Sequence, residues 1–109
     1  MGAKMTQRDY AIAKELKKQL SKVVHLIEFR VFGSRAREDF NEYSDLDVFI
    51  EVEQFDKQLK QKMRKVIWEV GFKNSLYISP LFFTRDEIER SPLRVSPIVK
   101  NIEEEGVKI

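Results

Sequence analysis

Apolar residues recur with helical spacing in two long stretches of the chain. The first runs from Thr6, which can cap a helix, to about Val24, and its lysines lie off the apolar face. That face carries Ile12, Ala13, Leu16, Leu20 and Val23. The second runs from about Asp56 to Val70, and Gly71 is expected to end it. Its apolar stripe carries Leu59, Met63, Val66, Ile67 and Val70.

Three shorter stretches are typical of β-strands. IEFRVF (residues 27–32) alternates apolar with charged residues, as a half-buried strand does. DLDVFIEVE (residues 45–53) is rich in aromatic and β-branched residues after its first three positions. SLYISPLFF (residues 75–83) predicts a third strand. Because Pro80 cannot donate a ladder hydrogen bond, this strand should lie at an edge of the sheet or carry a bulge.

Short helices are expected where capping residues occur. SRARED, which follows a Gly-Ser turn, can form one, and TRDE is a capping box that opens another. The last helix opens at Ser96 and Pro97 and stops at Gly106. The resulting order αβ(α)βαβαα contains no internal repeat or flexible linker. It predicts a single α/β (α+β) domain over residues 1–109.

Composition and charge exclude several kinds of function. Hydrophobic residues make up 42% and charged residues 35% of the 109 residues, as in a soluble globular domain. The 20 Lys and Arg nearly balance the 18 Asp and Glu, and no aromatic residues interleave the lysines of the first helix, so nucleic-acid binding is not favoured. Without cysteine and with one histidine, disulfides and zinc sites are excluded. No stretch is long and apolar enough for a membrane span or signal peptide, and we expect a cytoplasmic protein.

The sequence SDLD contains two carboxylates so close together that they should repel each other. Side chains alternate along a strand, so Asp45 and Asp47 are expected on the same side, about 6.6 Å apart. A divalent cation between them would remove the repulsion. Oxygen ligands favour Mg²⁺, which takes its remaining ligands from water and substrate phosphates.

A Gly-Ser turn upstream could supply a phosphate site. Gly33 lets backbone N–H groups approach a phosphate closely, and the Ser34 hydroxyl could donate one more hydrogen bond. Arg35 and Arg37 could neutralise phosphate oxygens. Alone, each motif is more often a solvated turn. A strand, a Gly-Ser turn, ten intervening residues and a DxD pair together indicate a nucleoside triphosphate site.

The stretch VFGSRAREDFNEYSDLDVFI (residues 31–50) resembles the signature of the DNA polymerase β-like nucleotidyltransferases. Its GSRAR and SDLD segments are most similar to those of the minimal nucleotidyltransferases. The resemblance implies a nucleotidyltransferase fold, with a small mixed sheet flanked by helices. It also implies that Gly33 and Ser34 hold the triphosphate of ATP or another nucleotide, and that Asp45 and Asp47 bind two Mg²⁺ ions.

The same resemblance implies an activity and a partner. Mg²⁺-dependent transfer of a nucleoside monophosphate to an acceptor hydroxyl is the expected reaction, with Arg35 and Arg37 near the phosphates. The acceptor could belong to a HEPN-type partner protein, for which the chain would act as an antitoxin. Trp68 falls about half a turn from the apolar stripe of its helix. It could anchor an interface with a partner. Alternatively, it covers a neighbouring loop, or the helix is buried on two sides. A homo-oligomer is also possible.

Two departures from the family pattern leave a second function open. Glu38 and Asp39 follow the second arginine, where relatives often have glycine. Active relatives also carry a third carboxylate on a later strand, but LYISPLFF contains none. Ser79 is the expected replaced position, and Glu51 lies some 13 Å from Asp47 along its strand. The alternative function is therefore a catalytically weak or inactive module that binds nucleotide or a partner.

Overall fold

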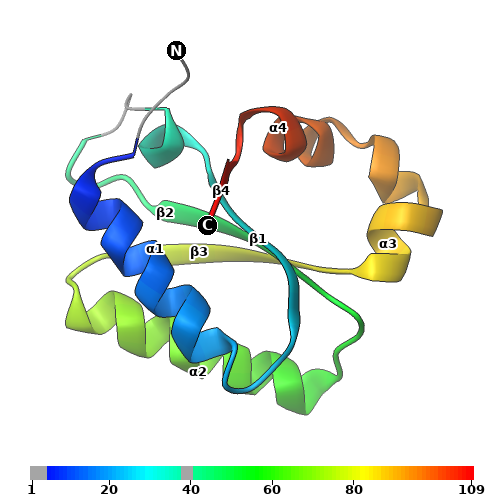
Figure 1. The fold of residues 1–109 in the computed structure, drawn as a ribbon, viewed down its shortest axis with the longest axis horizontal. Helices are drawn as coiled ribbons and strands as arrows, with labels where there is room; N and C mark the ends of the chain where they lie inside the picture. The colour runs from blue at the N-terminus through cyan, green and yellow to red at the C-terminus, as the bar shows by residue number, and fades with distance from the viewer. Residues whose placement is uncertain (1–4, 38–40) are drawn as a thin grey trace.

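A four-stranded mixed sheet organises the chain, of which the computed structural model describes residues 5–37 and 41–109 (Figure 1). The strands are β1 (Leu26–Phe32), β2 (Leu46–Val52), β3 (Ile78–Thr84) and β4 (Val107–Lys108). Their order is β3-β2-β1-β4; β1 runs antiparallel to β2 and to β4, and β2 runs parallel to β3. The mixed sheet confirms the expected fold class, whereas β4 was not predicted.

The helices begin at the capping residues that the sequence indicated. They are α1 (Gln7–Leu20), α2 (Lys57–Lys73), α3 (Arg85–Arg90) and α4 (Pro97–Glu105), with 3-10 turns η1 (Ser34–Ala36) and η2 (Pro92–Val95). The N-caps are Thr6, Asp56, Thr84 and Ser96, and Thr84 forms the predicted capping box with Glu87. Within the described ranges, no helix is long and apolar enough to cross a membrane.

Two predicted helices are shorter in the structure than expected. Helix α1 ends at Leu20 rather than near Val24, because the next N–H groups, those of Lys22 and Val23, donate to carbonyls three residues back and tighten the chain into turns. Val23 therefore lies beyond the helix and is exposed. Of the predicted SRARED helix, the structure shows only the turn η1, and Glu38 and Asp39 lie outside the described residues.

Gly71 does not end α2, contrary to the prediction. The helix continues to Lys73 and closes with a Schellman motif, in which Ser75 takes the left-handed conformation at φ 53°. The N–H of Leu76 donates to the Gly71 carbonyl at 2.9 Å, and a Cβ at Gly71 would overlap the Leu76 carbonyl oxygen. Glycine is needed there for close approach of the chain, and β3 starts only at Ile78 because residues 74–76 form the cap.

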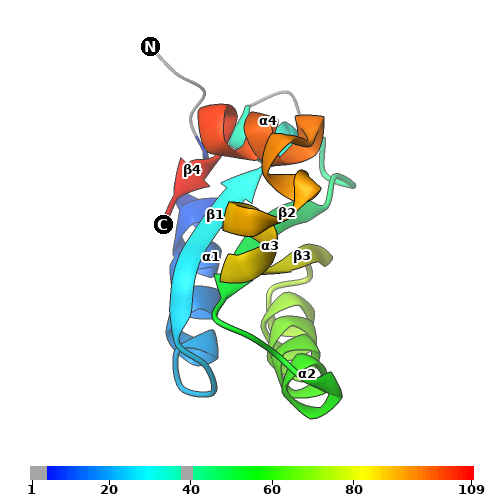
Figure 2. The same ribbon diagram turned by 90° about the vertical axis from the view of Figure 1, so that its right-hand side faces the viewer.

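The main core lies between one face of the sheet and helices α1 and α2. On this face Val31, Val48 and Ile50 are fully buried. The predicted helix stripes supply the other half of the core through Ile12, Ala13, Leu16, Leu20, Met63, Ile67 and Val70. Helices α3 and α4 lie together, away from α1 and α2, in the upper right of Figure 1 and above α2 in Figure 2.

The second face of the sheet carries charged side chains and is flanked by α3 and α4. Arg30 of β1 donates to the Glu103 carbonyl of α4 at 3.0 Å and pairs with Glu28 at 2.9 Å. Phe49 of β2 and Phe83 of β3 contact each other with ring centroids 5.4 Å apart. This is the face on which Asp47 lies, because it alternates with the core residues Leu46 and Val48.

Strand β3 forms one edge of the sheet, as Pro80 predicted. The N–H of Leu46 donates to the Tyr77 carbonyl at 2.9 Å. By alternation, the backbone groups of Ser79 and Leu81 point toward β2, and the nitrogen of Pro80 points outward. Pro80 therefore interrupts the outer edge of β3 and removes no hydrogen bond from the sheet.

Glu51 is a buried carboxylate on the second face, only 5% exposed. Burial is the main reason that its pKa is raised above the ordinary value of 4.5. Neighbouring carboxylates add to the effect and one guanidinium opposes it: these groups are Glu28, Glu89, Glu103 and Arg85. Glu28 also stands directly opposite Glu51 in the β1–β2 register, where like charges are unfavourable.

Glu51→Gln is expected to stabilise the protein by about 1 kcal/mol near neutral pH. The folded state holds the Glu51 proton more tightly than the unfolded state, so the unfolding free energy falls as pH rises from 4.5 through the raised pKa. Urea unfolding across that range should show the fall in the wild type and a smaller fall in the variant. The control is Glu53→Gln, whose half-exposed side chain should change stability by less than about 0.5 kcal/mol. Equal pH profiles for wild type and Glu51→Gln would contradict the prediction.

Candidate functional site

The Gly-Ser turn and the DxD segment meet at one end of β1 and β2. Phe32 and Asp47 are opposite each other in the register, so Gly33 leaves β1 directly beside the Asp47 carboxylate. Gly33 has φ 78° and ψ −161°, and a Cβ there would overlap Asp47 Oδ2. Both the backbone conformation and the close approach require glycine. Two segments that are separate in the sequence therefore form one site.

The two carboxylates differ in exposure. Asp45 lies immediately before β2 and is exposed, whereas Asp47 is half-buried in the strand. Burial, and then the charge of Asp45, raise the pKa of Asp47, while the charge of Arg37 lowers it. Asp45 therefore lies close enough to oppose ionisation of Asp47, which is the unfavourable interaction that a bound cation would remove.

Strand β3 brings Ser79 next to Asp47. The two residues are paired in the parallel register of β2 and β3, so their side chains lie on the same face of the sheet. The expectation that Ser79 replaces the third carboxylate of the family stays a prediction, and the register places Ser79 beside Asp47. Glu51 lies four residues along β2 from Asp47, about 13 Å away, and is surrounded by α3 and α4 instead.

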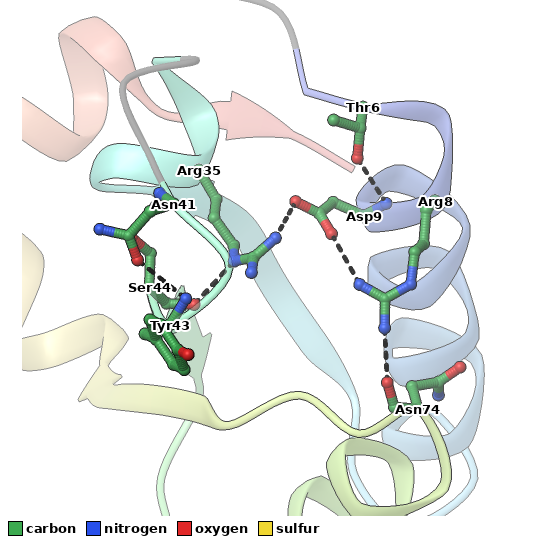
Figure 3. A network of polar contacts seen from close by, with 8 residues as sticks. All are labelled: Thr6, Arg8, Asp9, Arg35, Asn41, Tyr43, Ser44 and Asn74. Carbon is green, nitrogen blue, oxygen red and sulfur yellow. Dashed lines mark hydrogen bonds and ion pairs between the residues drawn. The ribbon is translucent and has the colours of Figure 1, made fainter.

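Arg35 forms a buried connection behind the site. Its side chain is nearly fully buried, and Nη1 lies 2.8 Å from Asp9 Oδ2 of α1 (Figure 3). Its Nε donates to the carbonyl of Ser44, the residue before Asp45, at 2.8 Å. The guanidinium therefore links the turn after Gly33 to the segment that leads into the carboxylates. The phosphate contact that the sequence suggested for Arg35 stays a prediction.

The network continues from Asp9 to the end of α2. Arg8 Nη1 lies 3.8 Å from Asp9 Oδ1, and Arg8 Nη2 donates to the Asn74 carbonyl at 2.6 Å (Figure 3). Sequence reasoning missed this network, although a signal was present. Asp9 lies on the same helical face as Ile12, Ala13 and Leu16, and a carboxylate on an apolar stripe needs a buried cationic partner.

Helix α4 supplies a wall of the site that the sequence did not indicate. A cavity of about 230 Å³ lies between this helix and the Gly-Ser turn. Phe32, Gly33 and Arg37 line one side, and Asn101 and Glu105 of α4 line the other. Arg37 is exposed at this cavity, and its charge acts on Asp47. The cavity thus brings the Arg37 cation and the backbone of Gly33 to one concave surface, and Gly33 is the lining residue that approaches Asp47.

The protein groups suit partial rather than complete coordination of a metal. Over residues 5–37 and 41–109, no cluster of three or more His, Cys, Asp and Glu could hold a metal ion. Asp45 and Asp47 are hard oxygen donors, and their mutual repulsion fits a cation that draws its other ligands from water and phosphate. The donor set is therefore compatible with Mg²⁺ bound together with a nucleotide.

Comparisons with known proteins indicate one family and one fold. A family described as "Nucleotidyltransferase domain" matches residues 11–109. A protein of Methanocaldococcus jannaschii named "Putative protein adenylyltransferase MJ0141" is 34% identical over 94 residues, which cover 77% of this chain and 95% of that protein. A solved structure from Sulfolobus solfataricus, described as a "putative nucleotidyltransferase", has a TM-score of 0.59 at 20% identity. That match covers 93% of this chain and 78% of the other, and it shows a likeness of fold.

Proposed function

The chain belongs to the nucleotidyltransferase domain family, and on that premise we propose that it transfers a nucleoside monophosphate from ATP to an acceptor hydroxyl. The contact between Gly33 and Asp47 carries the proposal, because it joins a phosphate-binding turn to a carboxylate pair. Neither the turn nor the carboxylate pair alone would indicate nucleotide transfer.

Each residue of the site has a proposed role. The backbone at Gly33, the hydroxyl of Ser34 and the guanidinium of Arg37 bind the triphosphate. Asp45 and Asp47 would hold Mg²⁺, which neutralises phosphate charge and favours attack by the hydroxyl. Arg35 is proposed to position these groups through its bonds to Asp9 and Ser44.

The proposed reaction is balanced without a further reactant. The acceptor oxygen attacks the α-phosphorus of ATP, and a new O–P bond forms. The bond from the α-phosphorus to the oxygen that bridges it to the β-phosphorus breaks, and pyrophosphate leaves. The acceptor proton passes to solvent, because Ser79, the residue beside Asp47 on β3, carries a hydroxyl and not a carboxylate that could accept it.

We propose that the acceptor belongs to a partner protein. The relative from M. jannaschii carries the name of a protein adenylyltransferase, which supports a protein acceptor. The resemblance to minimal nucleotidyltransferases favours a HEPN-type toxin as that partner, with this chain acting as its antitoxin. The chain would then control the toxin by modifying one of its hydroxyl groups.

Asp45→Asn and Asp47→Asn are each expected to reduce nucleotide transfer about 100-fold or more. The amides keep the shape of the side chains but lose the charge that holds the cation. The assay uses ATP labelled on the α-phosphate and Mg²⁺, with the protein alone and with the product of the neighbouring gene. Asp86→Asn is the matched control, because its exposed carboxylate lies on α3, beyond the far end of β3 from Ser79.

Transfer that persists in both variants would refute the assigned roles. If the wild type binds ATP only with Mg²⁺ yet transfers nothing under any pairing, the second candidate function applies, a binding module of the same fold. Ser79, beside Asp47 in the register, is the observation that favours it. Ser79→Asp then provides a further arm, because an added carboxylate should raise transfer only if the missing group limits catalysis.

A further inference from the structure

A second concave surface lies between α2 and β3, and the proposed transfer does not use it. This surface, here called the α2–β3 groove, has a volume of about 970 Å³. Apolar residues from α2, from β3 and from the connection between them are among its lining residues: Ile67, Leu76, Ile78 and Pro80. Three large aromatic residues also line it: Trp68, Phe72 and Tyr77.

The aromatic side chains of the groove are strongly exposed. Trp68 is 64%, Phe72 73% and Tyr77 70% exposed. The rings of Trp68 and Phe72 stack with centroids 5.0 Å apart and an angle of 16° between their planes. Stacking holds both rings in place before any partner binds, which reduces the entropy lost on binding. Contiguous exposed apolar side chains in a small protein mark an interaction surface.

Charge selects the kind of partner. Among the described residues that line the groove, the charged ones are Arg64 and Lys65, and both are basic. Arg64 is held over the ring of Phe82, 5.3 Å from its centroid. A second copy that used the same surface would bring these cations against their own counterparts. An acidic partner removes that repulsion, and Trp, Tyr and Arg are the residues that dominate the energy of protein interfaces.

The edge of β3 limits how the partner can bind. Pro80 offers no N–H on the outer edge, so an added strand could not form a continuous ladder along Ile78, Pro80 and Phe82. The contact must therefore be made by side chains in the groove. An amphipathic helix or a short apolar segment with acidic residues meets that requirement.

The groove also adjoins the candidate active site. Tyr77 lines the groove, and its carbonyl accepts the hydrogen bond from the N–H of Leu46, between Asp45 and Asp47. Two residues further on, Ser79 lies beside Asp47. The groove lies on the α2 side of β3 and Ser79 and Asp47 lie on the opposite face, so a partner held against Tyr77 would reach the carboxylates around the edge of β3.

We propose that the α2–β3 groove is a docking surface for an acidic, apolar segment of a partner protein. Docking brings the hydroxyl of that partner to Asp45 and Asp47. The docking itself depends only on the groove, whereas delivery of the hydroxyl rests on the proposed transferase function.

The test uses Trp68 as a reporter, because it is the only tryptophan in the chain. Peptides selected from a phage-displayed random library against the full chain should combine Asp or Glu with aromatic or aliphatic residues. Their binding should shift Trp68 emission to shorter wavelength. Lys65→Glu and Phe72→Ala should each weaken binding about tenfold or more. Lys62→Glu, an exposed position of α2 outside the groove lining, is the matched charge control and should bind like the wild type.

Several outcomes would overturn the proposal. These are an absence of enriched peptides, enrichment of basic peptides, and peptides that bind Lys65→Glu as tightly as the wild type. Trp68 emission that shifts with protein concentration while a dimer sediments would assign the groove to a second copy. A shift caused by single-stranded oligothymidine but not by peptide would assign it to nucleic acid. None of these experiments measures nucleotide transfer. A failure of docking can therefore be told apart from a failure of the proposed transferase function.

Discussion

Asp9→Asn is expected to lower the free energy of unfolding by about 3–5 kcal/mol. Asp9 is fully buried and Arg35 is 4% exposed, so Asp9→Asn removes a desolvated carboxylate charge that lies 2.8 Å from the buried guanidinium. The hydrogen bond from Arg35 to the Ser44 carbonyl compensates only part of that cost. Urea unfolding of wild type and variant, followed by circular dichroism, measures the difference.

Glu15→Gln provides the matched control for this measurement. Glu15 and Lys73 form an ion pair at 2.8 Å, the same distance as the Asp9–Arg35 pair, but the Lys73 side chain is 69% exposed. Solvent screens that pair, and its loss should cost less than about 1 kcal/mol. Similar costs for the two variants would mean that burial does not set the strength of the Asp9–Arg35 pair.

Gly33→Ala is expected to destabilise the fold by about 1–3 kcal/mol and to weaken binding of Mg²⁺–ATP about tenfold or more. Alanine at φ 78° is strained, and its Cβ would overlap Asp47 Oδ2. Relief of the overlap must displace either the turn or the carboxylate, and both belong to the proposed site. Unfolding curves measure the first effect and titration calorimetry the second.

Repeating Gly33→Ala in an Asp47→Ala background separates backbone strain from steric overlap as causes of the lost stability. Without the carboxylate the overlap disappears, so Gly33→Ala should then cost only the backbone strain. The stability difference between the two backgrounds measures the steric contact itself. If Gly33→Ala costs the same in both backgrounds, the turn does not press against Asp47 and the proposed union of the two motifs is wrong.

Local signals in the sequence predicted most of the helices and strands. Caps such as Thr6 and Ser96 act on the first turn of their own helix, and their effect is readable from a few residues. The end of α2 shows the limit of this reading. Gly71 looks like a helix terminator, but Ser75 takes the left-handed position and Gly71 meets Leu76 inside the last turn. Strand β4 is two residues long, too short for any periodicity to appear.

Two parts of the candidate site could be predicted, the Gly-Ser turn and the DxD segment, because each is a continuous stretch of the sequence. Their meeting at Gly33 and Asp47 depends on the β1–β2 register, which the strand patterns alone did not establish. The partnership of Arg35 with Asp9 spans 26 residues and crosses from a turn to a helix, so no local pattern contains it. For the same reason the α4 wall near Asn101 could not be predicted.

Pro80 has a consequence for how the protein behaves in a crowded solution. Exposed strand edges let unrelated chains join by backbone pairing, which is blind to sequence and leads to aggregation. An edge interrupted by proline resists such pairing, and the neighbouring aromatic groove can stay exposed at lower risk. Association at this edge then depends on side chains, so a mutation in either protein can change which partner is chosen.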